Sequence, residues 1–298
     1  MSALLDSRGL GKRYRGAWAL RDCTLSIPEP SIVGIAGPNG AGKSTLLGLA
    51  VGLLQPSEGA VTVCGLDPRR DPAALADIGY VAQGAPLLRG FSVGDMLDYA
   101  RVTNHRWDHA LACSLLSRSS RRTRVSALSP GERTQLGLAL ALGKRPALLF
   151  LDEPLARLDP LASREFLRLM MEGASETGSA VVLATRVLAD IERVCERVIL
   201  LGHGRVRLDG TVEELLASHR LLTGARRPLG RIRGVDGIIR ERSSGRQLTL
   251  LVRTDGPIVD PTWSVEQMGL EELLLAYMGP EELSSPEPPE PSRLRWHG

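Results

Sequence analysis

A glycine-rich segment that carries one lysine is the part of this sequence best suited to hold a chain of phosphates. It follows the apolar run 32–36, satisfies the phosphate-loop pattern G-x-x-x-x-G-K-[ST] and reads Gly37, Pro38, Asn39, Gly40, Ala41, Gly42, Lys43, Ser44 and Thr45. Glycines let backbone N–H groups and the N-terminus of a following helix approach polyphosphate oxygens. The Lys43 ammonium would contact the β- and γ-phosphates, and the Ser44 hydroxyl would ligate Mg²⁺. The segment predicts a site for a nucleoside triphosphate with magnesium.

An acidic pair is the second feature with chemical potential. Asp152 and Glu153 end the apolar run 147–151, and ligands of open α/β sheets bind at the carboxyl ends of such strands. Asp152 would hold Mg²⁺, and Glu153 would face the γ-phosphate and act as general base toward the attacking water. Alone, the pair could equally be two solvated carboxylates that end a strand. The phosphate loop upstream favours the catalytic interpretation.

Length and composition predict a globular intracellular protein. The chain has 298 residues, of which 43% are apolar, and this is enough for a sizeable core. The net charge of +3 gives no nucleic-acid footprint. The cysteines are far apart, which predicts reduced thiols in a cytosolic compartment. No run approaches the roughly 20 apolar residues that span a bilayer, so a membrane role would require another chain.

The order of predicted elements indicates a doubly wound α/β core. Strands are expected at 17–27, 31–36, 59–64, 78–83, 147–151 and 180–184. Apolar residues at helical spacing predict an all-helical insertion from about residue 86 to residue 124. Buried strands that alternate with helices are typical of a parallel sheet covered on both faces.

The pattern changes after Arg220, where a small C-terminal unit is expected. Residues 227–230 are predicted to form a linker, and 238–239 and 248–252 to form the strands of a hairpin. A helix is expected at 264–278, with Ser264 as its cap. The proline- and glutamate-rich tail from Gly279 is predicted to be disordered.

With these motifs in place, the chain resembles the ATP-binding subunits of ABC transporters over residues 3–219. Tyr14 lies where that family places a ring against adenine, Gln83 matches its Q-loop glutamine, segment 128–132 matches its LSGGQ motif, and Asp159 matches its D-loop aspartate. The resemblance implies binding of ATP with magnesium. It also implies that Gln83 joins Ser44 and Asp152 at the metal, and that Glu153, Gln83, Arg186 and Asp159 take part in catalysis.

The resemblance further implies a fold and a domain organisation. The expected fold is a P-loop NTPase (RecA-like) core at 1–219, with an N-terminal antiparallel β subdomain and a helical subdomain at about 86–143. A small C-terminal α+β appendage would follow at 220–280, and 281–298 would form the disordered tail.

The segment 128–132 also implies that such subunits work in pairs. The Ser129 hydroxyl and the Gly131 N–H, at the start of a predicted helix, form a second anion site. In the family this site closes over ATP held by the phosphate loop of the other subunit. Pro130 replaces a glycine but suits the first helical position, so binding is expected to survive. Glu132 replaces a glutamine and adds negative charge near the nucleotide.

Two departures from the family pattern affect the expected chemistry. Arg186 stands where the family has a histidine that contacts the γ-phosphate, and arginine cannot lose its proton or accept a hydrogen bond. Ala156 replaces a D-loop serine. These changes predict either slow hydrolysis or a heterodimer with a better-equipped partner.

The resulting functional prediction is an ATP-binding and ATP-hydrolysing subunit that dimerises around ATP and drives a separate membrane permease from the cytoplasmic face of the cell membrane. Segments 187–195 and 271–278 are similar to subunits paired with ABC-2-type exporter permeases. One alternative is a nucleotide-gated, weakly hydrolytic partner in a heterodimeric transporter. The other is a soluble ABC-type ATPase acting on ribosomes or DNA, which the single phosphate loop and the lack of sustained heptads disfavour. No nucleic-acid partner is expected.

Overall fold

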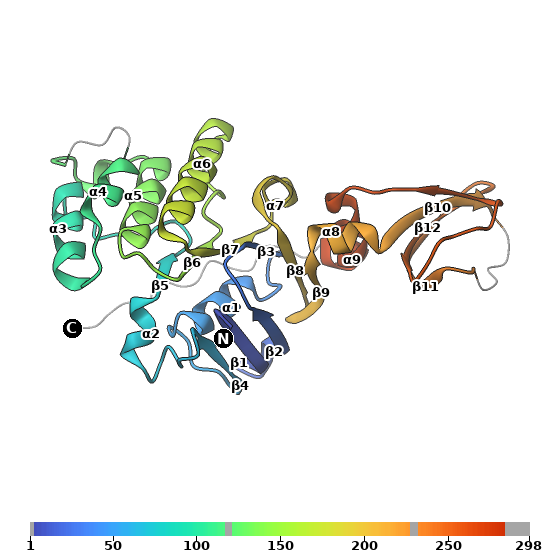
Figure 1. The fold of residues 1–298 in the computed structure, drawn as a ribbon, viewed down its shortest axis with the longest axis horizontal. Helices are drawn as coiled ribbons and strands as arrows, with labels where there is room; N and C mark the ends of the chain where they lie inside the picture. Colours follow the sequence, from blue (N-terminus) through green and yellow to red (C-terminus); the bar gives the residue numbers. More distant parts are fainter. Residues whose placement is uncertain (1–2, 117–120, 227–231, 284–298) are drawn as a thin grey trace.

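The computed structural model describes residues 3–116, 121–226 and 232–283. A mainly parallel sheet crosses the N-terminal two thirds of the chain (Figure 1), in the strand order β5-β6-β7-β3-β8-β9. Its strands are β3 (Ile32–Ala36), β5 (Ile78–Val81), β6 (Leu148–Asp152), β7 (Ala180–Thr185), β8 (Arg197–Gly202) and β9 (Arg205–Thr211). Only β9 runs antiparallel to its neighbour. Every residue of β6 and β7 is buried, as their apolar runs predict.

A small antiparallel sheet packs below α1, in the order β2-β1-β4 (Figure 1). Its strands are β1 (Leu5–Tyr14), β2 (Ala17–Ile27) and β4 (Glu58–Val63). The helix α1 (Lys43–Ala50) begins directly after the predicted phosphate loop. The antiparallel β subdomain at the N-terminus is therefore confirmed.

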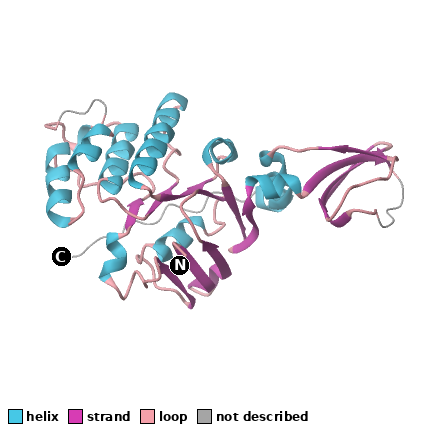
Figure 2. Cartoon of the chain, in the orientation of Figure 1, coloured by secondary structure: helices cyan, strands magenta, loops and turns pink. Residues whose placement is uncertain are grey.

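Helices α3 to α7 lie on one side of the parallel sheet, shown in cyan in Figure 2, and α2 (Pro72–Ala76) lies on the other side with α1. The bounds on the first side are α3 (Val93–Thr103), α4 (His109–Ser114), the 3-10 turn Val125–Ala127, α5 (Pro130–Leu142), α6 (Pro160–Thr177) and α7 (Leu188–Val194). Val93, Leu97 and Leu136 are buried together where α3 meets α5, which explains the helical spacing seen in the sequence. The predicted helical insertion is present, formed here by α3 and α4.

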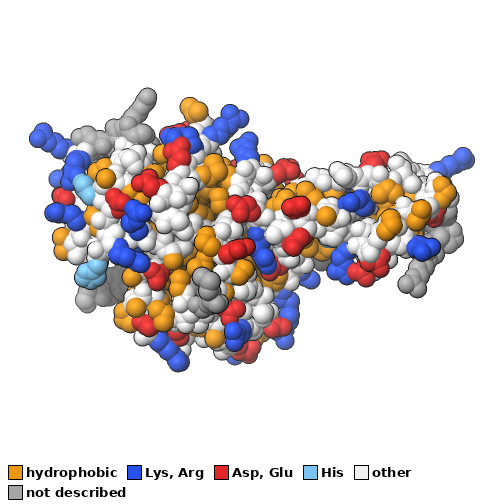
Figure 3. All heavy atoms as spheres, in the orientation of Figure 1, with side chains coloured by type: hydrophobic (Ala, Val, Ile, Leu, Met, Phe, Trp, Pro, Cys, Tyr) orange, Lys and Arg blue, Asp and Glu red, His pale blue; other side chains and the backbone are white. Residues whose placement is uncertain are grey.

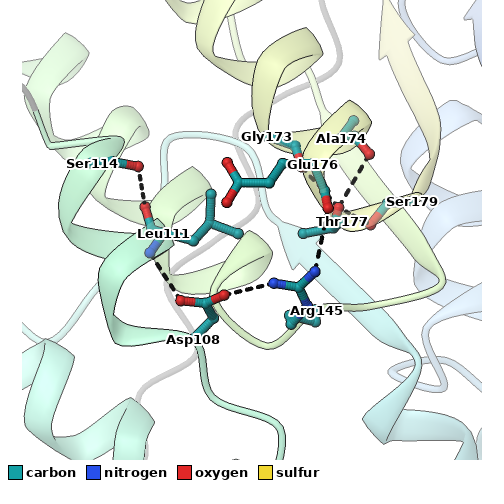
Figure 4. A network of polar contacts seen from close by, with 9 residues as sticks. All are labelled: Asp108, Leu111, Ser114, Arg145, Gly173, Ala174, Glu176, Thr177 and Ser179. Atoms are coloured by element: carbon teal, nitrogen blue, oxygen red, sulfur yellow. Dashed lines mark hydrogen bonds and ion pairs between the residues drawn. The ribbon is translucent and has the colours of Figure 1, made fainter.

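A polar network connects the start of α4 and the end of α6 with the turn that leads into β6 (Figure 4). Arg145 lies in the turn between α5 and β6, and its guanidinium donates to Asp108 (2.6 Å) and to the Glu176 carbonyl (3.3 Å). Asp108 also caps α4 by accepting from the Leu111 N–H. At the end of α6, the Ser179 hydroxyl donates to the Pro146 carbonyl at 2.6 Å. The ends of α4 and α6 are thereby fixed beside the strand that carries Asp152.

The C-terminal part extends away from this core as an arm (Figure 1). It consists of α8 (Val212–Ala217), β10 (His219–Ala225), β11 (Val235–Ser244), β12 (Gln247–Thr254), β13 (Trp263–Glu266) and α9 (Leu270–Leu283), with the sheet order β11-β12-β10-β13. The predicted hairpin is confirmed as β11 and β12. Positive and negative side chains are interspersed over the face shown in Figure 3.

The prediction of a helix over 264–278 with Ser264 as cap is wrong at its start. Ser264 lies in β13 and pairs with Thr223 of β10, because Trp263 inserts into the core beneath the sheet. The helix begins at Leu270. The predicted tail also begins too early, because α9 continues after Gly279, where the backbone bends (φ 66°, ψ 164°), to residue 283. The predicted linker at 227–230 and the tail from 284 onward lie outside the described residues.

A buried histidine of β10 holds α8 and α9 of the arm together. His219 hydrogen-bonds the Leu215 carbonyl through Nδ1 (2.7 Å) and the Tyr277 hydroxyl through Nε2 (2.8 Å). Since a carbonyl only accepts, Nδ1 carries the proton and Nε2 accepts from the phenol. Burial lowers the pKa of His219, and Arg253 and Arg220 lower it further.

We predict that this contact makes stability depend on pH. Because the folded pKa is depressed, the unfolded chain takes up the proton first as the pH falls below the ordinary value of 6.5. The stabilisation is thus fully present above that pH and is lost under acid conditions. Denaturant unfolding from pH 8 to pH 5 should show a smaller pH slope for His219→Gln than for wild type. The exposed His105→Gln is the control, and equal slopes for His219→Gln and wild type would contradict the assignment.

Candidate active site

The predicted phosphate loop joins β3 to α1 and is so tightly folded that two of its glycines admit no side chain. Gly37 and Gly42 have φ values of 152° and 106°, which L side chains rarely adopt. A Cβ on Gly37 would lie 2.5 Å from the Leu201 carbonyl oxygen, and one on Gly42 would lie 2.6 Å from that of Ala19. No side chain caps the first turn of α1, so the N–H groups of that turn suit an anion.

The rest of the loop is a compact turn at Asn39 and Gly40. The Ala41 N–H donates to the Pro38 carbonyl at 3.2 Å and closes this turn. Thr45 lies in the first turn of α1. The structure therefore places all the predicted loop residues in one tight segment between the end of β3 and the first turn of α1.

An ion pair links the loop to the acidic pair at the end of β6. The Lys43 ammonium lies 3.2 Å from Glu153 Oε1, and their side chains are only 6% and 9% exposed. Lys43 also donates to the carbonyls of Gly37 (2.7 Å) and Pro38 (3.1 Å). All three of these contacts of the Lys43 ammonium are to oxygen atoms. Phosphate oxygens could take the place of the two carbonyls.

The backbone of Glu153 is itself unusual. Its φ is +46°, a conformation that costs energy in a residue other than glycine. Its N–H donates to the Ala184 carbonyl at 2.9 Å, and the ladder between β6 and β7 pairs Asp152 with Ala184. The left-handed turn directs the Glu153 carboxylate back toward Lys43.

Asp152 and Ser44 provide adjacent oxygen atoms that fit a magnesium ion. The Ser44 hydroxyl donates to Asp152 Oδ1 at 2.9 Å. Burial raises the pKa of the Asp152 carboxyl, and the hydrogen bond from Ser44 opposes that rise. A hydroxyl and a carboxylate on neighbouring elements form the hard donor set that Mg²⁺ prefers. These two residues would hold the ion.

Arg186 and Gln83 lie at the same edge of the sheet. Arg186 follows β7, whose Thr185 accepts from the Val187 N–H (3.0 Å) and so bends the chain around the arginine. Gln83 follows β5, and the pairing of Val81 with a residue of β6 puts it one strand from Asp152. Both side chains are exposed. Their contact with the nucleotide stays a prediction.

Tyr14 ends β1 at the turn of the β1–β2 hairpin, where it pairs with Ala17. Its side chain is 44% exposed, and the Lys12 ammonium sits 5.1 Å from the ring centroid. The same hairpin carries the Ala19 carbonyl that touches Gly42. An accessible ring on the hairpin that reaches the loop suits the predicted contact with adenine, and that role stays a prediction.

Ser129 and Glu132 form a capping box at the start of α5. Ser129 Oγ accepts from the Glu132 N–H (3.2 Å), while Glu132 Oε2 accepts from the Ser129 N–H (2.9 Å) and hydroxyl (2.8 Å). Pro130 occupies the first helical turn, as the sequence predicts. The S-x-x-E spacing could have revealed this box from the sequence alone.

A cavity of about 260 Å³ lies beside this cap, and the predicted D-loop residue lines it. Asp159 caps α6 by accepting from the N–H groups of Leu161 and Ala162, each at 2.9 Å. Gly131 and Arg157 also line the cavity. Arg157 was not singled out in the sequence, because only the fold brings it to Ser129.

Apart from Tyr14, Gln83 and Arg186, the predicted site residues therefore fall into two groups. The loop, Asp152 and Glu153 form one group, and Ser129, Gly131, Glu132 and Asp159 form the other. No residue of the phosphate loop is among the described residues that line the cavity beside Ser129.

Comparison with known proteins identifies this arrangement. The sequence model of the family described as ABC transporter matches residues 20–156. The Nod factor export ATP-binding protein I of Rhizobium johnstonii (strain DSM 114642 / LMG 32736 / 3841) is 34% identical over 71% of this chain and 70% of its own length. The thiamine import ATP-binding protein ThiQ of Jannaschia sp. (strain CCS1) is 35% identical over 65% of this chain and 88% of its own. A solved structure titled "Structure of ATP binding subunit of ABC transporter" aligns with a TM-score of 0.64 and 27% identity, over 72% of this chain and 92% of that chain.

The chain belongs to the ATP-binding subunits of ABC transporters. It therefore has the P-loop NTPase fold and is an ATPase subunit of a transporter. Within residues 3–116, 121–226 and 232–283, no helix of this ATP-binding subunit combines the length and apolar character needed to cross a membrane.

We predict that Lys43→Ala weakens ATP binding by about tenfold or more, because a charge-assisted phosphate contact is worth about 1.5–3 kcal/mol. Titration with ATP at fixed Mg²⁺ measures the effect. Arg70→Ala removes a cation whose side chain is 89% exposed and should leave affinity unchanged. Thermal unfolding without ligand shows whether Lys43→Ala still folds. Affinity equal to wild type in a folded Lys43→Ala would contradict the role.

Proposed function

We propose that this subunit binds Mg-ATP between its phosphate loop and the Ser129–Gly131 segment of a second chain, and that closure of this pair drives a membrane permease. The division of the site into two groups carries the proposal. One group offers a cation and metal ligands for phosphate, and the other offers a hydroxyl and a helix N-terminus with no phosphate-binding loop beside it. Two chains in head-to-tail order would complete two such sites.

The buried ion pair indicates how binding prepares hydrolysis. When Lys43 turns from Glu153 and the loop carbonyls to the β- and γ-phosphates, the Glu153 carboxylate loses its cation. It can then accept a proton from the water that attacks the γ-phosphorus, while the bond to the β-phosphate oxygen breaks and ADP leaves. Bound Mg²⁺ would supply positive charge to the phosphates, held by Ser44 and Asp152. Gln83 and Asp159 would help to align this site.

An apolar groove beside Gln83 is the surface that we assign to the permease. It has a volume of about 590 Å³ and runs between the end of β5 and α3. Leu53 and Tyr99 line it and are 68% and 54% exposed. Apolar side chains of this size at a groove are typical of a protein contact. A short apolar helix of the permease would fit here, next to the glutamine that follows β5.

We assign the chain to export rather than import, on the resemblance of 187–195 and 271–278 to subunits of ABC-2-type exporters. The named relatives include both an export and an import protein, so their names do not decide the direction. The direction is tested by isolating the membrane protein that copurifies with the chain. A permease with an importer's extracellular binding protein would overturn the assignment.

A second candidate function is that of a weakly hydrolytic partner in a heterodimer. Arg186 at the edge of β7 favours it, because a fixed cation binds phosphate but cannot exchange protons with water or Glu153. The partner would then supply the better-equipped site.

We predict that Glu153→Gln prolongs the closed pair by removing the base. Sizing chromatography should show association of this variant with ATP but not with ADP, which is the matched ligand control. The variant should be measured alone and with its permease. No ATP-dependent association in either setting would contradict the pairing.

We also predict that Arg186→His raises the ATPase rate severalfold with little change in nucleotide affinity, whereas Arg186→Ala lowers the rate further. One preorganised electrostatic contact is typically worth about 10²–10³ in rate, and a misfit donor forfeits part of it. Both variants should be assayed in the assembled transporter. If Arg186→His is no faster than wild type, Arg186 is an adapted catalytic residue and the site is not impaired.

A further inference from the structure

The start of α5 holds a carboxylate on the donors that the proposed function assigns to a phosphate. Glu132 Oε2 accepts from both the N–H (2.9 Å) and the hydroxyl (2.8 Å) of Ser129. These donors lie at the N-terminus of a long helix, where the backbone dipoles favour negative charge. The chain thus places one of its own anions at its second anion site.

An incoming γ-phosphate must compete with this carboxylate for the Ser129 hydroxyl. Hydrogen bonds to a charged acceptor are about twice as strong as those to a neutral one. Two anions that share one donor also repel each other. A glutamine at position 132 would keep the capping box, since its amide oxygen can accept from the Ser129 N–H, but it would release the hydroxyl more easily.

The same cavity contains a cationic side chain, that of Arg157. Arg157, from the loop between β6 and α6, lines the cavity with Ser129 and Glu132 and makes no ion pair with any residue in the described part of the chain. The other acids of the cavity are already engaged. Asp159 caps α6, and Glu165 pairs with Arg168 at 2.7 Å. Glu132 is the carboxylate left for Arg157.

We propose that Glu132 is an internal competitor for the γ-phosphate of the opposite chain, and that Arg157 receives the Glu132 carboxylate when that phosphate takes the Ser129 hydroxyl. Arg157 is then a positioning residue that acts through Glu132, and the exchange sets how much ATP is needed for two copies of this chain to associate. The inference rests on the proposed function, because the phosphate comes from a second chain.

The test is a double-mutant cycle in the Glu153→Gln background, with the dimer dissociation constant measured by sedimentation equilibrium at fixed Mg-ATP. Glu132→Gln should tighten association by about tenfold or more per site. Arg157→Gln should weaken association when Glu132 is present and have no effect when it is replaced by glutamine. Arg157→Lys, which keeps the charge, should restore most of the loss. Glu272→Gln, the same change on the arm, should do nothing.

Each of the following outcomes would overturn the inference. Unchanged association in Glu132→Gln would show that Glu132 is only a helix cap. An equal loss from Arg157→Gln in both backgrounds would show that Arg157 contacts the phosphate itself, and would also overturn the inference. Absence of ATP-dependent association in the Glu153→Gln parent, with ATP still bound at the phosphate loop, would overturn the proposed pairing and the inference with it. Thermal unfolding of each variant confirms that the fold is kept.

Discussion

The ion pair between Lys43 and Glu153 is the constraint on which the rest of this site depends. Both side chains are almost fully buried, and a buried charge is tolerated only when it is paired and hydrogen-bonded. The Lys43 ammonium pairs with Glu153 and donates to the loop carbonyls of Gly37 and Pro38. We propose that a triphosphate with its metal, a better partner than a carbonyl, turns Lys43 outward and frees Glu153. Nucleotide binding and readiness for hydrolysis would thereby be one event.

The fold holds Lys43 and Glu153 close to each other. Lys43 begins α1 after β3, Glu153 follows β6, and β7 lies between these strands and bonds to both. The network around Arg145 fixes the start of α4 and the end of α6 beside the turn that leads into β6. The helices also carry Ser129 and Asp159 to a separate cavity, which no described residue of the phosphate loop lines. The proposed reliance on a second chain rests on where α5 and α6 begin.

Features set by local sequence could be predicted, and features set by distant packing could not. The phosphate loop, the strands before Lys43 and Glu153, and the hairpin at Gly245 depend on spacing within a few residues, so the sequence alone places them. The predicted helix started too early, at Ser264, because the helical spacing after residue 270 extends by chance into the preceding residues. Those residues form a strand, which only the pairing with β10 reveals. Arg157 escaped notice because the fold alone brings it to Ser129. The left-handed turn at Glu153 has no sequence signal either, since glutamate rarely adopts it.

The most direct test of the shared site is complementation between two inactive chains, Lys43→Ala and Ser129→Ala. Each alone lacks one half of every site and should hydrolyse ATP poorly. A mixed pair combines the intact phosphate loop of the Ser129→Ala chain with the intact Ser129 of the Lys43→Ala chain, so one site is whole. The account predicts that mixing the two purified variants, in the presence of the permease, restores ATP hydrolysis above that of either variant. Activity that never exceeds the average of the two separate variants would contradict it.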